Sequence, residues 1–131
     1  MPKPWPVDWR CRDVETTLVD DELLVLASFR DDPPNHYVIV SRLLVPGDEQ
    51  RVHLERDDQI WAIYDGFTAC RLWNDRIEFE LTDEGQSKLV LPSRVFVIMM
   101  ELSHDKMWEL RRTMAVIFAG RNDYVDKMIR K

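Results

Sequence analysis

Carboxylates are the residues of this chain best suited to chemistry, because paired carboxylates serve in acid–base catalysis and bind Mg²⁺ or Ca²⁺. The obvious candidate pairs are Asp57–Asp58 and Glu78 with Glu80. Asp57–Asp58 is typical of a turn, and adjacent strand residues point to opposite faces. Glu78 and Glu80 share a face, but it is opposite the apolar residues of the same stretch. Both pairs therefore predict solvent-facing charge, with no catalytic or metal site.

The other chemically useful residue types are dispersed along the chain. Cys11 and Cys70 are far apart, and the sequence favours reduced thiols, with Cys70 as a small core residue, over a catalytic thiol. His36, His53 and His104 lack a second ligand at metal-like spacing, which favours surface or capping roles. The chain contains no nucleophile elbow, phosphate-binding loop or HExxH pattern. We therefore expect no cofactor and no enzymatic activity.

The composition and net charge of the chain limit the kinds of molecule that it is expected to bind. The chain has 131 residues, 45% of them hydrophobic, and a formal net charge of −6. This charge disfavours nucleic acid as a partner and suits either a basic protein partner or simple solubility. No apolar run approaches the roughly 20 residues of a membrane helix. The start, MPKPWPVDWR, lacks the apolar core of a secretory signal. We expect a cytoplasmic protein.

A series of strands precedes one strong helix. Alternating or continuous apolar runs bounded by Asp, Asn, Pro and Gly predict the strands, and a run apolar on both faces predicts a strand covered on both sides. The helix has Ser103 as its N-cap and Gly120 at its C′ position. The predicted strands cover Val14–Val19, Glu22–Phe29, Tyr37–Val40, Arg51–Arg56, Ile60–Asp65, Phe67–Trp73, Arg76–Leu81 and Arg94–Leu102, and the last of these is apolar on both faces.

This order predicts one α+β domain spanning residues 1–131. We expect a curved, mainly antiparallel sheet of about seven to eight strands, with the C-terminal helix packed on one face. Thr82 is the expected N-cap of a further one or two helical turns. Residues 1–12 are expected to form a loose lead-in whose Trp5 and Trp9 are pinned back onto the body of the domain. The tail Asn122–Lys131 is expected to add a short helix. The helix stripe that packs on the sheet is Met107, Leu110, Met114, Ile117 and Phe118.

Large aromatic residues stand among the acids of the strand series. Trp61, Trp73 and Trp108 are each placed where a side chain could be partly exposed. Tryptophan rimmed by charge is typical of the energetic centre of a protein interface. The alternative is that both sheet faces are covered and all three tryptophans belong to the core. The sequence leaves these two interpretations equal.

The stretch ERDDQIWAIYDGFTACRLWNDRIEFELTDEG resembles bacterial immunity protein 10. The resemblance includes DELLVLASFRDDPPNHYVIVSR before it and WELRRTMAVIF after it, and thus most of the chain. Its most specific part is Asp57, Asp58, Gln59, Tyr64 and Gly66, of which Gln59, Tyr64 and Gly66 could be structural. The family often has two glycines after the tyrosine, where this chain has Asp65–Gly66, so exact toxin contacts do not transfer.

The resemblance implies a small protein of a polymorphic toxin system that neutralises a cognate toxin by stoichiometric binding. The expected partner is a basic toxin domain, often a nuclease, which carboxylates would steer and tryptophans would anchor. On this basis we expect the partner-binding residues to be Asp57, Asp58, Trp61, Asp65, Trp73, Glu78 and Glu80.

Two other interpretations remain open. A small-ligand-binding or enzymatic α+β domain would need an enclosed cavity with convergent polar groups in the curved sheet. A homo-oligomeric structural domain would associate with itself, helped by the net positive tail Asn122–Lys131.

Overall fold

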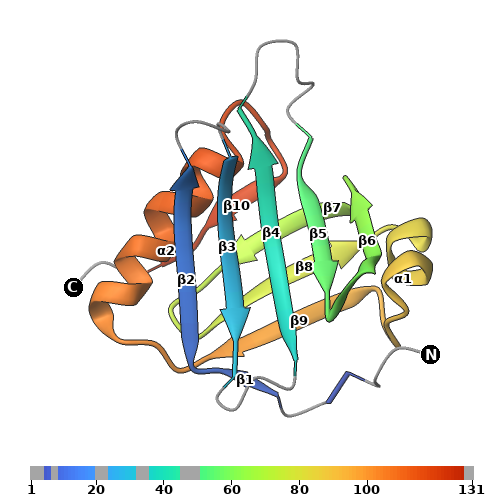
Figure 1. The fold of residues 1–131 in the computed structure, drawn as a ribbon, viewed down its shortest axis with the longest axis horizontal. Helices are drawn as coiled ribbons and strands as arrows, with labels where there is room; N and C mark the ends of the chain where they lie inside the picture. Colours follow the sequence, from blue (N-terminus) through green and yellow to red (C-terminus); the bar gives the residue numbers. More distant parts are fainter. Residues whose placement is uncertain (1–4, 7–8, 20–23, 32–35, 45–50, 129–131) are drawn as a thin grey trace.

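Two five-stranded sheets packed face to face form the body of the protein. The computed structural model describes residues 5–6, 9–19, 24–31, 36–44 and 51–128. The strands of one sheet run across those of the other, with a helix at each side (Figure 1). The α+β class is confirmed, whereas the single curved sheet is wrong. No helix of the described residues is long and apolar enough to span a membrane.

Sheet B is an antiparallel meander in which each strand pairs with the next along the chain. Its connections from β2 to β3, β3 to β4 and β4 to β5 include residues outside the described ranges, so the turns expected at Asp20–Asp21, Asp31–Asn35 and Pro46–Gly47 are not described as a whole. The observed strands confirm the positions that the sequence pattern predicts. They are β2 (Asp13–Val19), β3 (Leu24–Arg30), β4 (Tyr37–Leu43), β5 (His53–Arg56) and β6 (Asp58–Tyr64).

Sheet A has the order β1-β9-β8-β7-β10 and lies behind sheet B in Figure 1. Its centre is antiparallel, but β1 and β10 add to the two edges in parallel pairing. Both edge strands are very short, and both lie in segments expected to be lead-in or tail. The strands are β1 (Arg10–Cys11), β7 (Phe67–Leu72), β8 (Arg76–Leu81), β9 (Val95–Met100) and β10 (Tyr124–Asp126).

The core fills the space between the inner faces of the two sheets. On sheet B, Phe29 and Leu54 are fully buried, and on sheet A Phe79 and Ile98 are fully buried. Strict alternation produces this arrangement, since β8 buries every second residue and exposes the others partly. Trp9 is also buried, as expected for a residue pinned to the body.

The two helices close opposite sides of the molecule (Figure 1). Helix α2 (His104–Ile117) packs against β2, β3 and β4, and the whole predicted apolar stripe is buried. Helix α1 (Asp83–Leu89) packs against β6 and β8. Both predicted N-caps are confirmed: the Ser103 hydroxyl accepts from Lys106 N, and that of Thr82 accepts from Gly85 N.

Three local expectations are wrong. The tail forms β10 beside β7, where Cys70 N donates to Asp123 O and Lys127 N donates to Leu72 O, and its described part contains no helix. Helix α2 ends at Ile117 with Phe118 as its C-cap, so Gly120, at φ 81°, lies one residue beyond C′. Strand β9 is covered on one face only, and Val95 on its other face is 47% exposed.

Two glycines allow α1 to pack directly on the turn between the sheets. Gly66 lies between β6 and β7, and its carbonyl accepts from Thr82 N and from the Thr82 hydroxyl. A Cβ on Gly85 would lie 1.9 Å from the Gly66 carbonyl oxygen, and a Cβ on Gly66 would lie 2.4 Å from Ile63. Gly85 therefore cannot carry a Cβ unless the Gly66 backbone moves, and a Cβ on Gly66 would collide with the Ile63 side chain.

We predict that Gly85→Ala destabilises the protein by about 2–4 kcal/mol, because backbone atoms must separate to admit the methyl group. Urea unfolding followed by tryptophan fluorescence would measure the loss. Ser87→Ala, in the same helix but exposed, should change stability by less than about 0.5 kcal/mol. Equal stability of the two variants would contradict the close packing.

Candidate interaction surface

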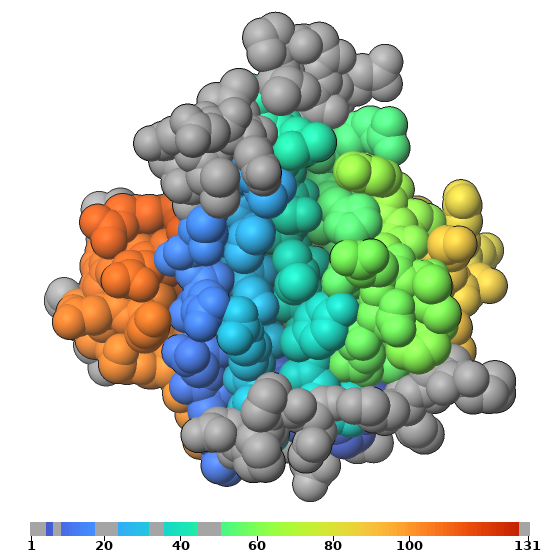
Figure 2. All heavy atoms as spheres, viewed as in Figure 1, coloured from blue at the N-terminus to red at the C-terminus, as the bar shows by residue number. Residues whose placement is uncertain are grey.

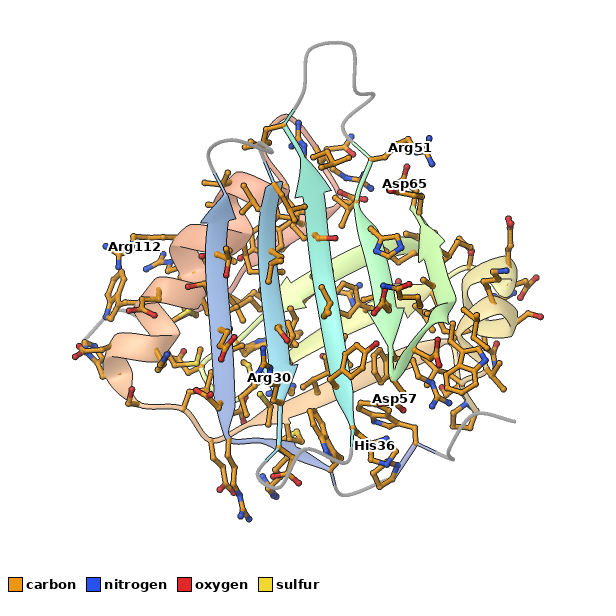
Figure 3. The ribbon with its side chains drawn as sticks, in the orientation of Figure 1. Arg30, His36, Arg51, Asp57, Asp65 and Arg112 are labelled. Carbon is orange, nitrogen blue, oxygen red and sulfur yellow. The ribbon has the colours of Figure 1, made fainter. Side chains whose placement is uncertain are left out.

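The residues predicted to bind a partner lie on two separate parts of the molecule. Asp57, Asp58, Trp61 and Asp65 belong to β6 and its flanking turns in sheet B. Trp73, Glu78 and Glu80 belong to β8 and the preceding turn in sheet A. Asp57 and Asp65 lie at opposite ends of β6 (Figure 3). The structure thus divides the predicted set into two groups instead of one continuous patch.

Asp57 holds the backbone together and presents no surface charge. Its side chain is 1% exposed, and its carboxylate contacts His36 Nδ1 at 2.9 Å, Arg56 Nη1 at 2.8 Å and the Tyr37 backbone N–H at 2.9 Å. Its backbone is left-handed at φ 64°, beside a register shift in the β5–β6 pairing. His36 and Asp57 face each other below β4 and β5 (Figure 3).

The guanidinium of Arg56 occupies the centre of this network. The side chain is 1% exposed, and it donates to Leu89 O at 2.9 Å and to Val90 O at 2.8 Å. It lies 5.9 Å from the ring of Trp5 and 5.6 Å from that of Trp61. Arg56 therefore joins β5 to the carboxyl end of α1, where the helix dipole favours positive charge.

The rest of the sheet B group is partly exposed. Asp58 is exposed, and its carboxylate accepts from the Ile60 backbone N–H. Trp61 is half-buried on the inner side of β6, against Arg56. Asp65 has a left-handed backbone at φ 54°, accepts from the Val52 N–H at 3.1 Å and forms an ion pair with Arg121 at 2.5 Å. Of these, Asp58 offers an exposed carboxylate with no ion pair among the described residues.

The sheet A group lies on the outer face of that sheet. Trp73 is half-buried, with the Arg76 guanidinium 4.1 Å from its ring. Glu78 pairs with Arg76 at 3.6 Å, and Glu80 pairs with Arg71 at 2.7 Å. The carboxylates are thus neutralised by neighbouring arginines, and this face is less negative than the count of acids in the sequence predicts.

The family-motif residues have different surroundings. Gly66 is structural, as its contact with Gly85 shows. The Tyr64 ring is on the outer face of sheet B, 46% exposed, 4.8 Å from the His53 ring and 4.1 Å from the Arg51 guanidinium. Gln59 is exposed on β6. The motif therefore combines a packing requirement with surface residues.

Sequence reasoning missed outward-facing apolar residues on both sheets. On sheet A, Val95 and Val97 of β9 lie beside Glu80 and Glu78 of β8 in the strand register. On sheet B, which presents an uncovered face in Figure 2, Leu26 and Ile39 of β3 and β4 are only partly buried. These positions were missed because we expected the strand Arg94–Leu102 to be covered on both faces. The sequence did indicate these exposed apolar residues, because a strand that is apolar on both faces must either have both faces covered or expose apolar side chains to solvent.

The two cysteine thiols and the His104 imidazole make contacts within the fold. Cys11 and Cys70 are fully buried, and burial raises the pKa of Cys11 to about 11 and that of Cys70 well above its ordinary value. A raised pKa disfavours the thiolate that a nucleophile requires. His104, at the start of α2, accepts from Trp108 Nε1 at 2.7 Å. Within the described ranges, no group of His, Cys, Asp or Glu could hold a metal ion.

A surface groove of about 770 Å³ adjoins α1. Its lining includes one carboxylate, Asp83, one amide, Gln86, and one hydroxyl, Ser87, and the rest is apolar. Such a lining favours contact with an apolar group more than acid–base chemistry.

Comparison with known proteins identifies one relationship. The family model described as Immunity protein 10 matches residues 10–107, from β1 into the first turn of α2. No curated protein and no solved structure matches the chain. The matched range contains every predicted partner-binding residue.

We predict that Asp57→Asn destabilises the protein by about 3 kcal/mol, because it removes the carboxylate that neutralises the buried Arg56. Asp58→Asn is the matched control, and as an exposed neighbour it should cost less than about 1 kcal/mol. Urea unfolding at neutral pH would measure both. If Asp57→Asn were as stable as the control, the buried network would not have the role described above.

Stability should also fall at alkaline pH. The unfolded chain loses the Cys11 proton near its ordinary pKa of 9.0, whereas the folded chain keeps it to about 11, so folding weakens as pH rises across this interval. Cys70 acts in the same direction. Each such thiol contributes a slope of about 1.4 kcal/mol per pH unit. Urea unfolding between pH 8 and pH 10.5 should show the decline, less steep in Cys70→Ala; a flat profile would contradict it.

Proposed function

This chain belongs to the immunity protein 10 family, and we propose that it neutralises its cognate toxin by forming a stoichiometric complex with it. The family makes it an immunity protein of a toxin system and suggests a non-enzymatic role. The mechanism is then occlusion: the bound protein covers the toxin surface that its target needs.

The observation that carries this proposal is the outer face of sheet A. There Val95 and Val97 of β9 lie beside Glu80 and Glu78 of β8. Trp73 directly follows the last residue of β7 in the same sheet. An apolar centre with a charged surround is the composition of protein interfaces. We take Trp73, Glu78 and Glu80 as contact residues on this face.

One carboxylate of this face stays accessible to a basic partner although it is ion-paired. Glu80 is 43% exposed in its side chain while paired with Arg71, so a partner lysine or arginine can approach the same carboxylate. The net charge of −6 would accelerate the encounter with a positively charged toxin domain. A nuclease domain fits this description, because it must carry positive potential to hold nucleic acid. We place the encounter in the cytoplasm, where such a toxin would act.

The predicted contact residues on sheet B contribute less directly to toxin binding. The carboxylate of Asp57 is enclosed, and that of Asp65 is paired with Arg121, so these two are assigned to the fold. Asp58 and Trp61 stay candidates for a secondary contact beside β6. This division leaves the outer face of sheet A as the principal binding face.

We predict that Trp73→Ala weakens toxin binding by about 30-fold, equivalent to about 2 kcal/mol, because a partly buried tryptophan is a typical interface anchor. Titration calorimetry against a catalytically inactivated toxin from the neighbouring gene would give the affinity and the one-to-one ratio. Co-expression with active toxin would show whether protection falls in parallel.

Trp108→Ala is the matched control. Trp108 is also half-buried and also lies beside an arginine, but on α2, and its replacement should leave affinity unchanged. Absence of any complex with the wild-type chain would refute stoichiometric inhibition. Equal affinities of Trp73→Ala and the wild type would remove sheet A as the binding face.

A further inference from the structure

The groove beside α1 continues toward the outer face of sheet A. It is lined by Trp5, Asp83, Val90, Leu91 and Pro92, among others. A second groove of about 190 Å³ shares its Trp5, Leu91 and Pro92 lining and reaches Val95 and Val97. The two grooves therefore form one apolar path from α1 to the valines that flank Glu80 and Glu78.

Val90 is held in this groove against its own backbone preference. It is the C-cap of α1, in the left-handed conformation at φ 52° and ψ 57°, where glycine or asparagine is usual. A β-branched residue is strained in this conformation. The residue is 44% exposed, so core packing does not compensate the strain. Strain retained at an exposed apolar residue points to a role outside the fold.

The walls of the groove are fixed before any partner arrives. Trp5 packs edge-on against Phe96 with ring centroids 5.0 Å apart. Arg56 donates to the carbonyl oxygen of Val90 at 2.8 Å, which holds the backbone that carries the strained residue. A preformed groove loses little conformational freedom on binding, which favours affinity.

The chemistry of the lining defines the occupant. Most of the lining is apolar, and the single carboxylate, Asp83, is 81% exposed in its side chain, where Arg94 pairs with it. A large apolar side chain would fill the groove, and a neighbouring lysine or arginine would reach Asp83. Farther along, a basic residue of the same partner would meet the exposed part of Glu80.

We propose that the α1–β9 groove is the anchor site for the cognate toxin, and that Val90 contacts one large apolar side chain of the toxin flanked by basic residues. This inference rests on the proposed function and specifies where its principal anchor inserts. Val90 is thus a binding residue retained at the expense of helix capping.

Val90→Asn and Val90→Gly test the proposal, because both residues accept the left-handed backbone without strain. We expect the thermal midpoint of each variant to equal or exceed that of the wild type, while its affinity for inactivated toxin falls at least tenfold. Val116→Asn replaces an equally exposed valine on α2, on the opposite side of the molecule, and should bind as the wild type does.

The outcomes separate this inference from the function on which it rests. If the wild type binds toxin and both Val90 variants bind equally well, the groove is not the anchor site, although the immunity function stands. If the wild type forms no complex, the proposed function itself fails. A loss of binding in the Val90 variants together with an equal loss in Val116→Asn would also overturn the assignment of the groove.

Discussion

The buried guanidinium of Arg56 is the interaction on which the arrangement of this protein most depends. It neutralises Asp57, donates to two carbonyl oxygens at the end of α1, and lies near the rings of Trp5 and Trp61. A charge so enclosed is stable only when all its partners are in place. The position of α1, the turn into β6 and the packing of Trp5 are therefore fixed together.

A second constraint is steric and acts at the other end of α1. The helix begins at the Gly66 carbonyl, to which Thr82 donates twice, and it can do so only because Gly85 has no side chain. Arg56 at one end and the glycine contact at the other leave this short helix no freedom to shift. This explains how seven residues, too few for a stable isolated helix, provide a rigid wall for the neighbouring groove.

The sequence predicts local structure well and long-range pairing poorly. Alternation located the strands from β2 to β9, and the Ser103 and Thr82 caps located both helices, because each signal is contained within a few residues. The split into two sheets depends on how the chain turns at Asp65–Gly66, which no periodicity encodes. Strands β1 and β10 pair with partners far away along the chain, so their short segments had no local signal. Among the predicted contact residues, Asp57 was indistinguishable in sequence from Asp58, since burial of one carboxylate beside an exposed one is decided by Arg56, His36 and the β5–β6 register.

The order of the strands along the chain has a consequence for synthesis. Sheet B is a sequential meander, and all its strands have left the ribosome once Tyr64 has emerged. Sheet A receives one edge from β1, which precedes all the strands of sheet B along the chain, and the other from β10, which follows them. Its second edge is added only once Asp126 has emerged. A truncated chain that stops before Tyr124 would thus retain an unpaired β7 edge, and nascent or prematurely terminated molecules would be those most exposed to edge-to-edge aggregation.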